Sequence, residues 1–184
     1  MKKFYKYFAI PLLISIIASV LYLIDALIGN LFIDNGSFMW VAFAIWTIFY
    51  SAKIKDRIKG LIGVVFGFIA AIIMMSITNS FSLNIYTISI SCLLGVFLVN
   101  FVVMSMDKAD KILLGSVSGI FGGIFLTFSG LGVGLNPLNN LNDAFLTLGI
   151  LVTYTILGLA CGFFSILGSL KINNALKNKY QSDK

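Results

Sequence analysis

Few residues of this 184-residue chain could do chemistry, and most of those are neutral. The sequence contains no histidine and only two cysteines, so it lacks the ligands of a His- or Cys-based metal site. It also lacks a carboxylate pair within an apolar segment, a G-x-S-x-G motif and a phosphate-cradling glycine loop. We therefore predict a protein that is not an enzyme and that has no catalytic residues, no metal and no cofactor.

Several polar residues lie inside or at the ends of long apolar segments, where polar groups are the usual pointers to function. The candidates for a solute path are Asn100, Thr127, Ser129, Thr153 and Asp25. Hydroxyl groups bond back to their own helix, and an asparagine amide usually reaches a neighbouring helix. The same neutral groups could offer hydrogen bonds to a passing solute, so the packing role and the path role both stay open.

Asp25 is the one acidic residue among these candidates. It lies about 18 residues into the first apolar segment, which at 1.5 Å per residue is about 27 Å from the inner end, near the outer interface. We expect it to be solvated there. The alternative is that it attracts a cation or a substrate together with Asp34 and Asp143. Without an acid, a lysine or a histidine at mid-membrane, a proton-coupled pump is not favoured.

Glycines recur at helical spacing in three of the apolar segments. Residues four apart lie on one face of a helix, and a bare hydrogen at each position lets a second backbone approach closely. The positions predicted to pack helices are Gly63, Gly67, Gly115, Gly119, Gly122, Gly123, Gly158 and Gly162. We expect tight packing within or between protomers, and a narrow pore lined by bare backbone is the alternative.

The elements that must position these residues are membrane helices. With 59% apolar and only 11% charged residues, the chain has too little polar surface to cover a soluble globule. Its net charge of +6 comes from basic residues that flank apolar segments, without an interleaved aromatic surface. We therefore expect these charges to face anionic lipid headgroups and not nucleic acid.

The basic residues gather in four short clusters, and this grouping predicts the topology. The clusters are Lys2, Lys3, Lys6; Lys53, Lys55, Arg57, Lys59; Lys108, Lys111; and Lys171, Lys177, Lys179, Lys184. Each stretch between two clusters is long enough to cross a bilayer twice, since one crossing needs about 20 apolar residues. Because positive charge stays on the cytoplasmic side, both termini are expected there.

The predicted fold is an all-α, polytopic bundle of six transmembrane helices in a bacterial plasma (inner) membrane. A single transmembrane domain covers 1–170, and a polar cytoplasmic tail covers 171–184. The predicted spans are 7–28, 38–52, 60–78, 85–105, 112–130 and 144–170. The segment from Gly130 to Asp143 cannot be one continuous helix, so it is an outer loop or a re-entrant element, and Asn142 or Asp143 is expected to cap the last span.

Two segments carry a family resemblance. One is the tryptophan-containing short span from Trp40 to Ala52, followed by Lys59-Gly60-Leu61, and the other is Gly119-Ile-Phe-Gly-Gly-Ile-Phe-Leu-Thr-Phe-Ser-Gly130. Both resemble the bacterial domain-of-unknown-function family typified by the inner-membrane protein YcdZ. The chain departs from that family in its longer Gly- and Asn-rich segment after Gly130. The resemblance implies a small polytopic inner-membrane protein and leaves the activity open.

The sequence favours a channel or facilitator for a small uncharged solute. The alternative is a membrane scaffold or accessory subunit that does not transport and whose Gly-rich helix faces dock a partner helix. The expected partners are the lipid bilayer and a small-molecule solute, and a homo-oligomer is compatible with either role.

Overall fold

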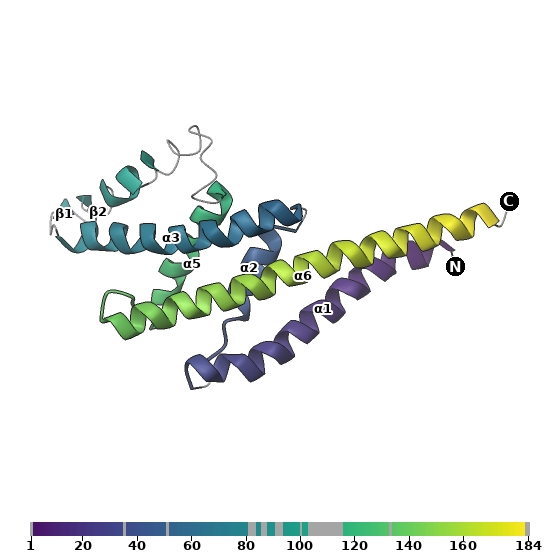
Figure 1. Cartoon of the computed structure of the whole chain (residues 1–184), viewed down its shortest axis with the longest axis horizontal. Helices are drawn as coiled ribbons and strands as arrows, with labels where there is room; N and C mark the ends of the chain where they lie inside the picture. Colours follow the sequence, from purple (N-terminus) through teal and green to yellow (C-terminus); the bar gives the residue numbers. More distant parts are fainter. Residues whose placement is uncertain are drawn as a thin grey trace. The chain divides into compact units, whose positions relative to one another are not determined.

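The computed structural model describes residues 2–34, 36–50, 52–80, 84–85, 88–90, 94–99, 101–102, 116–132 and 134–182. In chain order the labelled elements are α1 (Lys2–Phe32), α2 (Met39–Ile48), α3 (Ile54–Ser80), β1 (Asn84–Ile85), β2 (Ile88–Ser89), α5 (Val117–Leu131) and α6 (Leu141–Ser182) (Figure 1). Residues 94–99 and 101–102 are also helical. Apart from one short strand pair, the regular structure of the described residues is helical, as predicted.

Three helices of the described chain are long and apolar enough to cross a membrane: Phe8–Phe32, Ile54–Ser80 and Leu141–Ala175. They contain most of the first, third and sixth predicted spans. The helices α2 and α5 are apolar but have only 10 and 15 residues. At 1.5 Å per residue they rise about 15 Å and about 22 Å, less than the hydrocarbon core of about 30 Å.

The fourth predicted span, 85–105, differs from the structure at its start. There Asn84 pairs with Ser89 and Ile85 pairs with Ile88 in an antiparallel register. The β-branched residues of this stretch suit an extended backbone as well as an apolar helix, so hydropathy alone could not separate the two.

The chain divides into two compact units. The first contains Met1–Ser51 and Ile156–Lys184, and therefore holds α1, α2 and the C-terminal part of α6. Its buried core includes Leu21 of α1 with Val41 and Ile45 of α2. A Cβ added at Gly158 would meet the carbonyl oxygen of Ala42, so α6 approaches the backbone of α2 closely within this unit.

The second unit runs from Ala52 to Thr155 and is built on α3 and α5, which pack against each other (Figure 1). An apolar cluster of Met74, Val99, Ile120 and Ile124 fills part of its core. The N-terminus of α5 is capped by Ser116, whose Oγ accepts a hydrogen bond from the Gly119 amide at 3.1 Å.

The segment between α5 and α6 is irregular, as its glycines, proline and asparagines predict. Gly134 has a φ of 84°, a conformation that suits glycine, and the Leu135 amide donates to the Gly130 carbonyl at 3.0 Å. The predicted cap of α6, Asn142 or Asp143, is wrong by two or three residues. The helix begins at Leu141, so Asn140 is the cap, and its Oδ1 accepts from the Asp143 amide at 2.8 Å.

Candidate functional site

The glycines of α3 and α5 form a contact in which the two backbones touch. A Cβ added at Gly63 would lie 2.6 Å from the Ser116 carbonyl oxygen and 3.0 Å from the Gly119 Cα. One added at Gly119 would lie 2.5 Å from the Gly60 carbonyl oxygen. Real Cβ atoms essentially never come within 3.0 Å of such neighbours, so these positions of the crossing fit glycine only.

The same contact continues one turn further along both helices. A Cβ at Gly67 would meet the Ile120 carbonyl oxygen and would lie 2.8 Å from the Gly123 Cα. A Cβ at Gly123 would meet the carbonyl oxygen of Val64. A main-chain hydrogen bond of 3.0 Å from the Ser116 amide to the Lys59 carbonyl fixes the register at the start of α3. We call this contact the α3/α5 glycine seam: Gly60, Gly63, Gly67, Gly119 and Gly123.

The other glycines predicted to pack helices have different surroundings. Gly122 is buried on α5, and Gly158 and Gly162 are buried on α6, where Gly158 faces α2. Gly115 lies outside the described residues. The structure therefore places Gly63, Gly67, Gly119 and Gly123 in one contact within the second unit, while Gly158 and Gly162 belong to the first unit.

Asp25 is buried, with 2% of its surface exposed, so the expectation that it is solvated is wrong. Its Oδ2 accepts a hydrogen bond of 2.6 Å from the Ser37 hydroxyl, and its Oδ1 accepts one of 2.9 Å from the Phe38 amide. Both donors belong to the segment that leads from α1 into α2. The carboxylate thus holds the connection between two helices of the first unit, which counting residues along one helix could not reveal.

Thr127 is fully buried on α5, and its hydroxyl donates to the Gly123 carbonyl at 2.7 Å. Thr147 and Ser165 of α6 bond in the same way to the carbonyl four residues earlier, each at 2.7 Å. A hydroxyl that donates to its own helix has no hydrogen left for a solute. Thr127 is therefore a weak candidate for lining a solute path as a donor.

Ser129 and Thr153 are only half-buried, unlike Thr127. Within the described part of the chain their side-chain hydroxyls form no hydrogen bond, so both retain a donor hydrogen and acceptor lone pairs. Both belong to the second unit, whereas Asp25 belongs to the first. Asn100, the remaining candidate for the path, lies outside the described residues.

Reasoning from sequence missed the burial of Arg57. This side chain is 6% exposed, and its Nε donates to the Ala52 carbonyl at 3.0 Å. In the sequence Arg57 belongs to a basic cluster with three lysines, and a charge near a helix start gives no sign of which side chain folds inward. The Arg57 contact ties the turn before α3 to the first turns of that helix.

Two further hydroxyls, of Thr155 and Ser169 on α6, are buried and have no hydrogen-bond partner. Across the described ranges, no three Cys, Asp or Glu side chains come close enough to hold a metal ion. No family model, curated protein or solved structure matches this chain.

Proposed function

We propose that this chain is a six-span plasma-membrane protein with both termini in the cytoplasm, and that it acts as a passive facilitator for a small uncharged solute. The three long apolar helices support insertion in a bilayer. The four basic clusters support the six crossings and the sidedness. The resemblance to the YcdZ-type bacterial family is part of the same proposal.

The observation that carries the solute role is the pair of unengaged hydroxyls on Ser129 and Thr153. In an apolar segment, a hydroxyl usually donates a hydrogen bond to a carbonyl of its own helix, as those of Thr127 and Thr147 do. A half-buried hydroxyl that stays free can exchange hydrogen bonds with a neutral molecule. Because neither group carries charge, ions would gain little from such contacts.

A flux assay on purified protein in proteoliposomes tests this role with water, urea and glycerol as probes. The native chain is expected to raise the permeability to at least one probe above that of empty liposomes. Replacing Thr153→Val and Ser129→Ala removes the hydroxyls with little change of volume, and each is expected to lower that flux about two- to tenfold, since one hydrogen bond contributes about 0.5–1.5 kcal/mol.

The matched controls are Thr47→Val and Ser76→Ala. Their hydroxyls are exposed and donate to their own helices, to Phe43 at 2.9 Å and to Ile72 at 2.8 Å. Both controls are expected to keep the flux of the native chain. Permeability equal to that of empty liposomes for all three probes would rule out the facilitator role for these solutes.

The alternative, a scaffold that docks a partner through Gly-rich helix faces, has less support. The glycines of the α3/α5 glycine seam already contact each other within the second unit, so they present no free groove to another protein. A scaffold role would have to use other surfaces, and no particular contact favours one.

The proposed topology predicts which positions react with a membrane-impermeant maleimide in intact cells. In a background with Cys92→Ala and Cys161→Ala, we expect labelling after Asn139→Cys, in the loop between α5 and α6. Lys55→Cys and Lys171→Cys are expected to react only after the cells are permeabilised. All three replaced side chains are exposed, so burial cannot explain a difference. Labelling of Lys55→Cys in intact cells would contradict the sidedness.

A further inference from the structure

We propose that the start of α3 binds the phosphate of an anionic phospholipid through Lys53, Lys55 and Lys59. This site is separate from the solute path and needs only that α3 lies in a bilayer. The cluster would therefore bind a specific ligand and would not only be attracted to the membrane surface in general.

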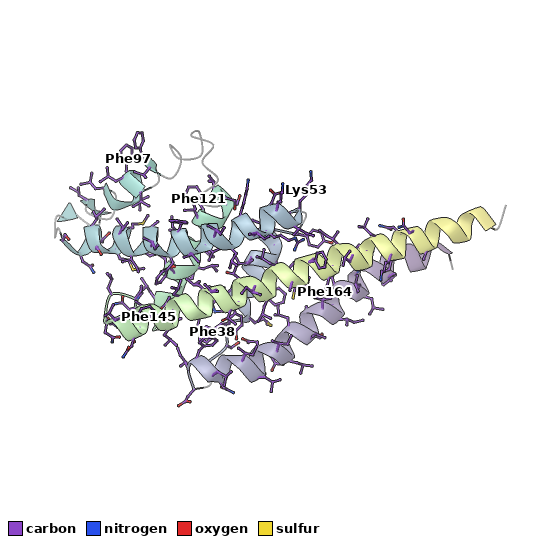
Figure 2. All side chains as sticks on the ribbon, viewed as in Figure 1. Phe38, Lys53, Phe97, Phe121, Phe145 and Phe164 are labelled. Atoms are coloured by element: carbon purple, nitrogen blue, oxygen red, sulfur yellow. The ribbon has the colours of Figure 1, made fainter. Side chains whose placement is uncertain are left out.

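The three lysines are available for a ligand. Lys53 and Lys55 are exposed and Lys59 is half-buried, and Figure 2 shows the Lys53 side chain pointing away from the start of the helix. Within the described residues their ammonium groups form no ion pair or hydrogen bond. The fourth basic residue, Arg57, is different, because it is buried and donates to the Ala52 carbonyl.

The length of α3 places these lysines at headgroup depth. The uncharged part of the helix, from Gly60 to Ser80, rises about 31 Å at 1.5 Å per residue, close to the hydrocarbon thickness of about 30 Å. Lys59 therefore lies at the edge of the hydrocarbon. Lys55 is one turn further out, about 6 Å, within a headgroup layer about 5–8 Å thick on each side.

Exposed apolar side chains on an adjacent row of the same helix favour a lipid over a free anion as the ligand. Ile54, Ile58 and Ile62 are spaced by four residues, so they share one helix face. They are 62%, 58% and 38% exposed, which is a high exposure for isoleucine beside charged residues. Of this isoleucine ridge, Ile62 lies inside the hydrocarbon, where an acyl chain would cover it, and Ile54 and Ile58 lie at headgroup depth beside the lysines, whose alkyl stems can pack along them.

The local charge balance favours an anion. Asp56 is the one acidic residue between Lys53 and Lys59, so the three lysines and this carboxylate together carry a net charge of +2 (three positive minus one negative). A zwitterionic headgroup brings no net charge to this surface. An anionic phospholipid brings one negative charge and two acyl chains, so it matches both the lysines and the isoleucine ridge.

The test uses the full chain purified in detergent and titrated with phosphatidylglycerol or phosphatidylcholine, with bound lipid counted by native mass spectrometry. We expect the native chain to retain phosphatidylglycerol in preference to phosphatidylcholine. Each lysine near an anionic lipid surface contributes about a fivefold change in affinity. The triple variant Lys53→Gln, Lys55→Gln, Lys59→Gln is expected to lose most of this preference, and the corresponding Lys→Arg variant to keep it.

A second triple variant, Lys171→Gln, Lys177→Gln, Lys179→Gln, removes the same charge from the C-terminal tail and is expected to keep the preference. If both glutamine variants lose it equally, net charge and not a site governs retention, and the proposal fails. Displacement of the lipid by millimolar inorganic phosphate would also overturn it, because the ridge would then contribute nothing. Helicity measured by circular dichroism should be equal in all variants, and their solute flux is measured separately.

Discussion

Replacing Gly123→Ala is expected to lower the stability of the second unit by about 1–3 kcal/mol or more. The added Cβ would meet the carbonyl oxygen of Val64 and would lie 2.9 Å from the Val64 Cα, and both atoms belong to the α3 backbone. A backbone cannot move aside as a side-chain end can, so α3 and α5 would have to separate. Thermal unfolding in detergent micelles should show a lower midpoint, and Gly67→Ala should lower it for the same reason.

Gly130→Ala, in the last turn of α5, is the matched control. A Cβ there would lie 3.4 Å from the Leu135 Cβ, an ordinary van der Waals distance. Because alanine favours a helix over glycine by about 1 kcal/mol, this change should leave the midpoint unchanged or raise it. A Gly123→Ala variant as stable as Gly130→Ala would show that the α3/α5 glycine seam is not a close backbone contact.

Replacing Asp25→Ala is expected to destabilise the first unit by about 3–6 kcal/mol, since a hydrogen bond to a charged group contributes about 1.5–3 kcal/mol and the bonds from Ser37 and Phe38 are both lost. The substitution leaves the Phe38 amide, and to a lesser extent the Ser37 hydroxyl, without an acceptor. Asp25→Asn should cost less, because an amide oxygen can still accept from the Phe38 amide. Unfolding monitored by the fluorescence of Trp40 and Trp46, in the adjoining helix α2, is the measurement.

The control for Asp25 is Asp34→Ala, which removes an acidic residue that is exposed in the same unit. Its effect should be within about 0.5 kcal/mol of zero. A double-mutant cycle with Ser37→Ala should give a coupling energy of about 0.5–3 kcal/mol, as expected for groups in direct contact. Additive effects of Asp25→Ala and Ser37→Ala would contradict the contact described here.

Some features were readable from the sequence because they depend on local order along the chain. Long apolar runs predicted the spans 7–28, 60–78 and 144–170, most of which lie in the helices Phe8–Phe32, Ile54–Ser80 and Leu141–Ala175. Hydropathy over about 20 residues is a property of the segment itself. The break between α5 and α6 was readable for a similar reason. Glycine, proline and asparagine at 130–140 oppose a helix wherever the segment lies.

The expectations that differ from the structure concern where helices begin and end, and which residues meet a partner distant in sequence. Residues 38–52 were predicted as a span, but α2 has only 10 residues and is followed by a turn at Phe49 and Tyr50. The predicted span 85–105 starts with the β1 and β2 pair, because short apolar runs suit either state. The cap of α6 is Asn140 and not Asn142 or Asp143, because the residue at which a helix begins depends on tertiary context.

By itself, the sequence determined the apolar composition, the segregation of basic charge and the glycine spacing, and so the helical character of the protein and the faces its helices could pack. Only the tertiary structure decided that Gly63 and Gly67 meet Gly119 and Gly123, since spacing shows a face but not its partner. The tertiary structure also decided that Asp25 is buried and hydrogen-bonded, because its two donors lie 12 and 13 residues away along the chain. One helix alone would leave this side chain in solvent. The physical reason is the same in both cases: contacts between elements depend on how backbones approach in space, and periodicity within one element does not contain that information.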